Sequence, residues 1–152
     1  EVIKKYVPRL TLEEYHERTC KAFSRFIRAT VESWRYPPLV DNSFFLCINY
    51  NELKKDMDLS TYIARETNYD AVEFRIDLVV APLIEAKAGY KEIVSAITEA
   101  MSIIRVLFTL PVIYTCRTCA DGGQFDISDG YEMYNNLVLL GISLGCEYLD
   151  VE

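Results

Sequence analysis

The sequence of 152 residues contains one histidine and no apolar run near the length of about 18 residues that a membrane-spanning helix needs. Its net charge of −7 argues against a basic surface of the kind that binds nucleic acid or an anionic membrane. The N-terminus lacks an apolar targeting core followed by a cleavage site. Five cysteines make an odd number without the spacing of a disulfide framework, which favours reduced thiols. These absences predict a cytoplasmic protein with neither nucleic acid nor a membrane as its partner.

Groups for acid–base or imine chemistry are scarce between residues 43 and 152. That stretch contains no histidine, because His16 lies upstream on a predicted helix among charged neighbours. Its lysines fall on predicted helices or an outer loop, at Lys54, Lys55, Lys87 and Lys91. We therefore expect a general base or a Schiff-base lysine to lie beyond Glu152, which leaves residues 43–152 chemically incomplete.

The first part of the chain predicts one long helix over residues 11–34. Thr11 can cap it, acidic residues follow in the first turn, and apolar residues recur at steps of three and four. Pro37 and Pro38 then prevent its continuation. We interpret residues 1–42 as a helical linker from an upstream domain.

From residue 43 onward, strands and helices alternate. Successive βα units of this kind predict a parallel sheet with helices on its outside. The rest of the chain holds half of the roughly eight βα units that a (βα)8 TIM barrel needs. We therefore expect an α/β fold, the N-terminal half of such a barrel; the alternative is a complete small open α/β sheet. The predicted strands are 43–49, 71–79, 111–117 and 147–152, and the predicted helices are 51–66, 90–108 and one that Ser128 or Asp129 caps and Gly145 ends.

Charged residues occupy alternate positions of the predicted strand 71–79. Glu73, Arg75 and Asp77 share one face, and apolar residues share the other. If helices cover the apolar face, the charges point into an enclosed interior, where each unpaired ion costs several kcal/mol. The pattern favours a polar binding site at the ends of the strands, and a half-exposed strand with a solvated polar face is the alternative.

Arg117 lies near the end of the predicted strand 111–117, before a Gly122–Gly123 turn. A guanidinium there can hold a carboxylate or hydroxyl groups in a fixed geometry, and the alternative is an internal salt bridge to Glu73. Cys116 and Cys119 have the spacing of a redox or zinc pair, but no second pair of ligands accompanies them. We predict no metal site.

These motifs together resemble the type I 3-dehydroquinate dehydratases. The resemblance covers residues 43–152, in order and with the right spacing. Residues 1–42 are similar to the connector that precedes this domain in the fungal pentafunctional AROM polypeptides, where a shikimate kinase domain comes first. The matching runs are Ser43–Ile48, Asp70–Asp77, Leu110–Thr118 with Gly122–Phe125, and Tyr148–Glu152.

The resemblance implies a TIM barrel that acts as a lyase in the shikimate pathway of aromatic amino acid biosynthesis. A lysine forms an imine with the ketone of 3-dehydroquinate, a histidine removes the neighbouring proton, and water leaves to give 3-dehydroshikimate. No metal or organic cofactor takes part. The partners it implies are this small-molecule substrate and the other domains of a multifunctional cytoplasmic polypeptide, while a homodimer stays open.

The resemblance also implies roles for single residues. Glu73 and Arg75 would contact substrate hydroxyls, and Arg117 would line the same pocket. Asp121 stands where the family usually has Glu or Gln, a residue that orients the histidine. Cys47 replaces a common serine and so removes a hydroxyl donor. These two departures keep a second function open: a catalytically silent barrel that serves as a scaffold or ligand-sensing domain in an AROM-like or related regulatory protein.

Overall fold

Four parallel strands form one sheet, in the spatial order β1-β2-β3-β4. The computed structural model describes residues 11–32, 43–51, 69–128 and 131–152, and the side chains of all of these except residues 28–32. The strands are β1 (Phe45–Ile48), β2 (Ala71–Arg75), β3 (Val112–Thr115) and β4 (Tyr148–Asp150). The helices are α2 (Leu12–Glu32), α5 (Asp77–Glu85), α6 (Tyr90–Leu107) and α7 (Glu132–Ser143), with a 3-10 turn, η3, at Cys119–Asp121.

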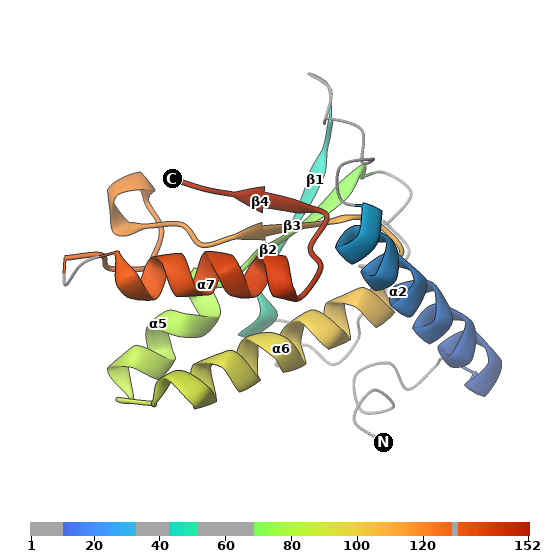
Figure 1. The fold of residues 1–152 in the computed structure, drawn as a ribbon, viewed down its shortest axis with the longest axis horizontal. Helices are drawn as coiled ribbons and strands as arrows, with labels where there is room; N and C mark the ends of the chain where they lie inside the picture. The colour runs from blue at the N-terminus through green and yellow to red at the C-terminus, as the bar shows by residue number, and fades with distance from the viewer. Residues whose placement is uncertain (1–10, 33–42, 52–68, 129–130) are drawn as a thin grey trace.

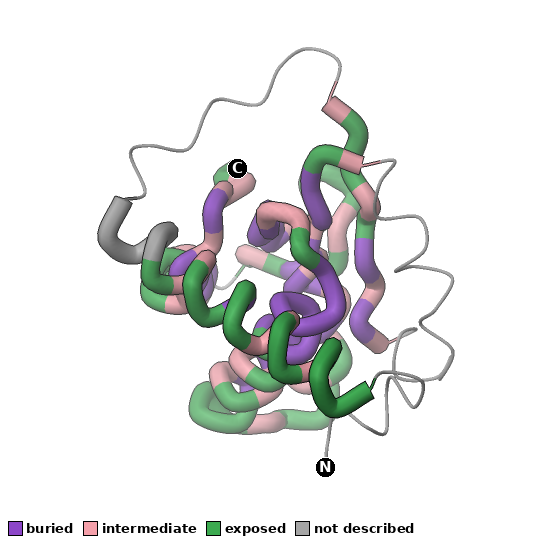
Figure 2. Tube along the Cα trace, turned by 90° about the vertical axis from the view of Figure 1, so that its right-hand side faces the viewer, coloured by how far each residue is buried: buried purple, intermediate pink, exposed green. Residues whose placement is uncertain are grey.

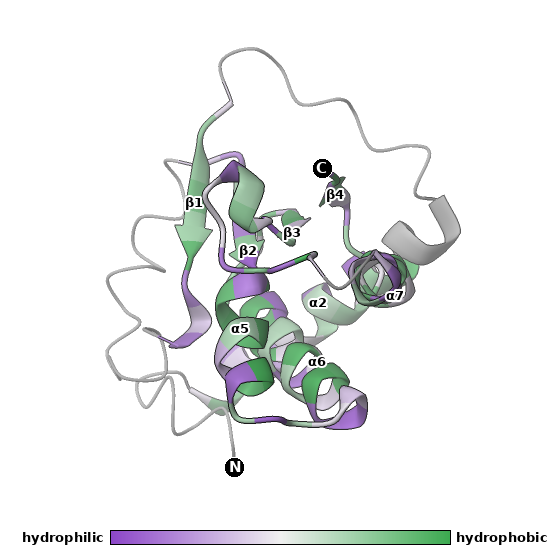
Figure 3. Cartoon of the chain, turned by 90° about the vertical axis from the view of Figure 1, so that its left-hand side faces the viewer, coloured by the Kyte–Doolittle hydropathy of each residue, from purple (hydrophilic) through white to green (hydrophobic). Residues whose placement is uncertain are grey.

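The strands follow one another in a curved row, and α5, α6 and α7 lie on its outer side (Figure 3). Neighbours in the sheet are also neighbours in the chain, and α6 and α7 provide the crossovers from β2 to β3 and from β3 to β4 (Figure 1). This α/β arrangement confirms the predicted class and is that of a partial TIM barrel. Among the helices that the structure describes, none combines the length and the apolar character required to cross a membrane.

The hydrophobic core lies between the sheet and the helices. Phe74 of β2 and Tyr114 of β3 meet edge to face, with ring centroids 6.3 Å apart, and both pack with the fully buried Ile97 and Ile104 of α6. Burying side chains of this size contributes about 1.5–3 kcal/mol each. The Tyr114 hydroxyl also donates to the Leu137 carbonyl at 2.9 Å, which fastens α7 to β3. Buried residues accordingly gather in the middle of the molecule, as Figure 2 shows.

The predicted strand 71–79 is wrong in its second half. β2 ends at Arg75, because Ile76 turns into the right-handed helical region (φ −74°, ψ −27°) and α5 begins at Asp77. An acidic residue in the first turn favours a helix, and here the Asp77 side chain is held by polar neighbours that a strand would not bring to it. Asp77 therefore does not continue the alternation of Glu73 and Arg75.

Other boundaries also differ from the predictions. The near-continuous apolar run of residues 43–49 predicts a strand that is buried on both faces, yet Phe45 is 42% exposed and Cys47 is exposed, since β1 is at an edge of the described sheet. Arg117 lies beyond the end of β3. The helix expected to begin at Ser128 or Asp129 begins at Glu132, with Tyr131 as its N-cap and no side-chain cap. Asp129 and most of the predicted helix 51–66 lie outside the described residues.

The long helix predicted for residues 11–34 is observed as α2, and its N-terminus has the expected cap. Thr11 Oγ1 accepts a hydrogen bond from the Glu14 amide at 3.2 Å, and the Glu14 carboxylate accepts one from the Thr11 amide at 2.8 Å. α2 lies against the C-terminal end of α6 (Figure 1). Its predicted apolar stripe is only partly used, because Leu12 and Phe23 remain 75% and 65% exposed.

Candidate active site

A hollow of about 380 Å³ opens on the face of the sheet opposite the helices, and residues of all four strands or their ends line it. Three of its side chains are charged: Glu73 on β2, Arg117 just after β3 and Asp150 on β4. The strand register explains this convergence, because Glu73 pairs with Ile113 and Ile113 pairs with Tyr148. The lining residues are Phe45, Glu73, Ile113, Arg117, Tyr148, Leu149 and Asp150.

Arg117 stands among three carboxylates. Its guanidinium nitrogens lie 3.7 Å from Glu73 Oε1, 3.8 Å from Asp150 Oδ2 and 3.6 Å from Glu152 Oε1. These separations exceed those of direct charge-assisted hydrogen bonds, which are about 2.7–2.9 Å. The Arg117 side chain is also 37% exposed, so its donors are accessible from the hollow. Arg117 and Glu73 thus form a loose ion pair that a ligand with hydroxyl groups can enter.

Arg75 is held differently, by a close two-point contact. Its Nε donates to Asp77 Oδ1 at 2.7 Å and its Nη2 donates to Asp77 Oδ2 at 2.6 Å. These bonds raise the pKa of Arg75, and Asp77 is fully buried. Asp77 Oδ2 also accepts a hydrogen bond from the Gln124 amide at 3.1 Å. The guanidinium is therefore oriented by one carboxylate at the start of α5 and by the loop after β3.

Cys47 lies beside Glu73 across the β1–β2 pair. Partial burial of the thiol, together with the charge of Glu73 and a hydrogen bond to it, raises the pKa of Cys47 to about 11. The side chain is therefore a neutral thiol near pH 7. A thiol is a weak donor, so Cys47 offers a poorer hydrogen-bonding group beside Glu73 than a serine hydroxyl would.

Asp121 stands apart from these residues. It is exposed, at the end of η3, and its carboxylate contacts the Thr118 hydroxyl at 3.4 Å. Within the part of the chain that the structure describes, Asp121 makes no ion pair with Arg117 or Arg75. The structure thus brings Cys47, Glu73 and Arg117 together, places Arg75 next to them on β2, and leaves Asp121 on the outer loop.

Three residues of this region were not assigned from the sequence. Thr115 is 1% exposed, its hydroxyl has no hydrogen-bond partner among the described residues, and its register position lies between Arg75 and Asp150. Asp150 and Glu152 supply two of the three carboxylates around Arg117. Thr115 precedes Arg117 by two residues. Because side chains alternate along a strand, this spacing is the sequence signal that Thr115 lies on the same inner face of the sheet as Arg117.

The local charge is negative. Two guanidinium groups, of Arg75 and Arg117, stand against the four carboxylates of Glu73, Asp77, Asp150 and Glu152. An excess of carboxylates on a partly enclosed face favours a cationic group in the hollow and disfavours an additional anion.

The chain is similar to known proteins over most of its length. The family model of type I 3-dehydroquinase matches residues 44–152. The chain is 34% identical over 134 residues to the pentafunctional AROM polypeptide of Komagataella phaffii (strain GS115 / ATCC 20864). That alignment covers 87% of this chain and 8% of the relative, and it is longer than the segment 44–152, so it extends into residues before position 44. The chain belongs to the type I 3-dehydroquinase family.

Proposed function

We propose that residues 43–152 form the substrate-binding half of a 3-dehydroquinate dehydratase domain, in which residues 1–42 are a linker from a preceding domain. The observation that carries this proposal is the hollow in which Arg117 stands among carboxylates from β2, β4 and the segment after β4. Membership of the type I 3-dehydroquinase family supports dehydration as the reaction. The limited share of the AROM relative that is matched supports a place within a longer multifunctional polypeptide.

The reaction needs two groups that we assign to sequence beyond Glu152. A lysine amine attacks the ketone carbon of 3-dehydroquinate and water leaves, which gives a protonated imine. A histidine then removes the proton next to the imine carbon, and the electron pair moves into the iminium to give a neutral enamine. The nitrogen lone pair then re-forms the iminium as the bond between the β-carbon and its hydroxyl oxygen breaks, and the hydroxyl takes the proton from the histidine and leaves as water. Hydrolysis of the imine releases 3-dehydroshikimate. The described lysines, Lys21, Lys87 and Lys91, are all exposed, and none of them lines the hollow.

The side chains of residues 43–152 bind the substrate and polarise it. Glu73 accepts a hydrogen bond from a substrate hydroxyl, while Arg75 and Arg117 donate to hydroxyl oxygens. The excess of carboxylates stabilises the cationic iminium relative to the neutral ketone. It also disfavours the carboxylate of the substrate, which we therefore place toward cationic groups of the other half of the barrel.

Turnover by a polypeptide that contains the whole barrel tests this proposal. We expect dehydration of 3-dehydroquinate, followed by the ultraviolet absorbance of the conjugated product, and borohydride should trap a covalent adduct visible by mass spectrometry. Glu73→Gln and Arg117→Gln should each lower kcat/KM by a factor of about 100 or more, since each loses a charged contact to substrate. Glu13→Gln, on the exposed part of α2, is the matched control and should leave turnover unchanged.

The 152-residue chain by itself should show neither turnover nor a trapped adduct. An adduct on one of its own lysines would contradict the assignment of the imine lysine to sequence beyond Glu152. Its cysteines are all free thiols, which fits our proposal that the polypeptide works in a reducing compartment, the cytoplasm.

A second function has one specific observation in its favour. Asp121, the residue expected to orient the histidine, is exposed, is not among the residues that line the hollow, and contacts the Thr118 hydroxyl through its carboxylate. A barrel that binds the substrate without converting it would act as a scaffold or ligand-sensing domain. Calorimetric binding of 3-dehydroquinate without turnover or a trapped adduct would support this function and contradict the dehydratase.

A further inference from the structure

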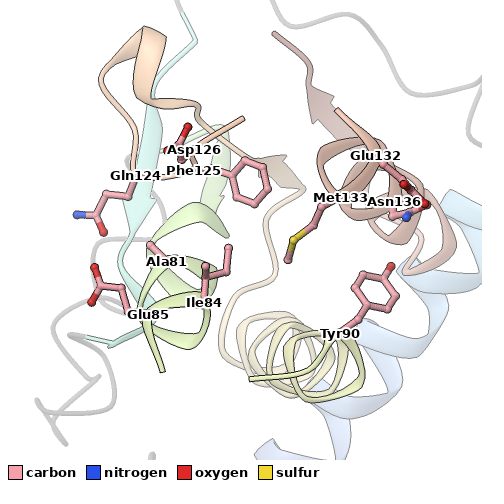
Figure 4. Close-up of a pocket in the computed structure, with 10 residues that line it drawn as sticks. All are labelled: Ala81, Ile84, Glu85, Tyr90, Gln124, Phe125, Asp126, Glu132, Met133 and Asn136. Carbon is pink, nitrogen blue, oxygen red and sulfur yellow. The ribbon is translucent and has the colours of Figure 1, made fainter. Parts of the chain in front are cut away.

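A second and larger cavity lies on the helical side of the molecule, away from the inner hollow. It has a volume of about 610 Å³, within the range of about 300–1,000 Å³ that is usual for small-molecule pockets. Its walls come from α5, the first residue of α6, the loop after β3 and the first turns of α7 (Figure 4). No residue of this cleft belongs to the charge cluster around Arg117.

The floor of the cleft is apolar. Figure 4 shows the side chains of Ile84, Phe125 and Met133 turned toward one another from three different elements. Phe125 is held firmly, because its ring packs on Tyr134 with centroids 6.1 Å apart and it is 2% exposed. Ile84 is 42% exposed and Met133 is partly exposed, so solvent reaches the floor at these two side chains. An accessible apolar floor enclosed by four segments is typical of a ligand site.

One side of the cleft is suited to a cation. Glu132 and Asn136 lie close together on α7, and the Tyr90 hydroxyl and ring lie on the same side (Figure 4). Two further carboxylates, those of Glu85 and Asp126, stand on the opposite wall, and no lysine or arginine is among the described residues that line the cleft. The tyrosine ring, which is 46% exposed, adds a face for a cation–π contact.

The floor is joined by hydrogen bonds to the candidate active site. The Phe125 amide donates to the Arg117 carbonyl at 3.2 Å, and the Phe125 carbonyl accepts from the Cys119 amide at 2.9 Å. The amide of Gln124, which also lines the cleft, donates to the carboxylate that holds Arg75. A ligand in the cleft therefore contacts the loop after β3, and hydrogen bonds of the same loop help to position Arg75 and Arg117.

We propose that this cleft is a binding site for a small hydrophobic amine. The apolar body of the ligand lies against Ile84, Phe125 and Met133, and its ammonium group lies between Glu132, Asn136 and the ring of Tyr90. This inference goes beyond the proposed dehydration and does not depend on it, since no residue of the cleft is assigned a part in that reaction.

Calorimetry with two probes of matched shape tests the charge preference. We expect 2-phenylethylamine to bind the full-length polypeptide with a Kd near or below about 1 mM, and phenylacetate, its anionic counterpart, to bind at least about tenfold more weakly. Equal binding of the two probes, or no binding of the amine at about 10 mM, would overturn the proposal.

Variants then locate the site. Met133→Arg places a cation in the cleft and should abolish binding of the amine, and Glu132→Gln should weaken it about three- to tenfold. Glu13→Gln removes the same charge on α2, outside the cleft, and should leave the affinity unchanged. Glu73→Gln should also leave it unchanged. Loss of binding in Glu73→Gln with retention in Met133→Arg would place the amine in the acidic inner hollow and overturn the assignment.

Discussion

Asp77 holds Arg75 through both carboxylate oxygens, with nitrogen–oxygen distances of 2.7 and 2.6 Å. The pair joins the end of β2 to the first turn of α5, and the Gln124 amide adds the loop after β3 to the same carboxylate. Since Asp77 is completely buried, the contact is shielded from water and is stronger than a surface ion pair. The orientation of Arg75 toward the inner face therefore depends on a residue outside the strand.

Asp77→Asn should lower the free energy of unfolding by about 3 kcal/mol, measured by urea denaturation. The substitution keeps the size of the side chain, but it leaves the Arg75 charge without its partner. The side-chain NH2 group of the asparagine would also face one of the N–H groups that donate to the Asp77 carboxylate. That buried N–H group would then have no acceptor.

The matched control for that prediction is Asp126→Asn. Asp126 is also an acceptor for a backbone amide, that of Ser128 at 2.8 Å, but it is exposed and pairs with no guanidinium of the described residues. Asp126→Asn should lower the free energy of unfolding by less than about 1 kcal/mol. Equal losses in the two variants would contradict the view that the buried ion pair is the source of the effect.

Replacing either of the adjacent glycines Gly122 and Gly123 by alanine should lower the stability of the protein, for a different physical reason at each position. Gly123→Ala would bring its Cβ within 2.7 Å of the Arg117 Cβ and into overlap with the Arg117 carbonyl oxygen, so the loop must move. Gly122 has a φ of +78° and open space around its Cβ position, so Gly122→Ala carries only the backbone penalty of about 1 kcal/mol. We expect Gly123→Ala to lose at least about 2 kcal/mol in thermal unfolding. A larger loss at Gly122 would contradict the placement of this loop against Arg117.

The strand order and the positions of Glu73 and Arg117 follow from the sequence, because alternation and strand ends are local properties. The helical start at Asp77 does not, since Val79 and Val80 are β-branched and favour a strand when taken alone. Tertiary contacts decide it: Asp77 is bonded to Arg75 and to Gln124, which lies 47 positions later in the chain. Thr115 and Asp150 were missed for a related reason, because their nearness to Arg75 depends on the register of three strands.

The reactivity of Cys47 should report the electrostatics of the hollow. Its pKa is raised to about 11, so the thiol is protonated below that pH and only about one molecule in a thousand carries the thiolate at pH 8. The rate of alkylation by iodoacetamide, followed by peptide mass spectrometry, should therefore rise about tenfold per pH unit between pH 8 and 10.

Glu73→Gln separates the contribution of Glu73 to the raised pKa of Cys47 from the contribution of burial. The charge of Glu73 and its hydrogen bond both raise the Cys47 pKa, so their removal should lower it and speed alkylation at pH 8 by about three- to tenfold. Cys116 provides the contrast, since burial raises its pKa to about 12 and it is 1% exposed. It should stay unmodified in the folded protein of either variant. An unchanged rate at Cys47 would show that Glu73 does not face the thiol.

The contact between α2 and α6 leads to the last prediction. Arg25 of α2 donates to the carbonyl groups of Arg105, Phe108 and Leu110, and Arg18 donates to that of Leu107. These carbonyls belong to the C-terminal end of α6 and to the residues just after it, where a cation is favoured by the helix dipole. Arg25→Ala removes these bonds and should release α2 from the sheet-and-helix body. We expect faster amide hydrogen exchange over residues 12–27, and a loss of about 2–3 kcal/mol of stability.

Lys21→Ala is the control for α2, because Lys21 pairs with Glu17 at 2.7 Å and both side chains are more than half exposed. An exposed pair of this kind is worth less than about 1 kcal/mol, so exchange over residues 12–27 should change little. If α2 stays equally protected in Arg25→Ala, the guanidinium contacts do not hold it, and packing at Ala22, which is 7% exposed, must do so. If α2 is released, the hydrogen bonds of Arg25 are what hold it against the C-terminal end of α6.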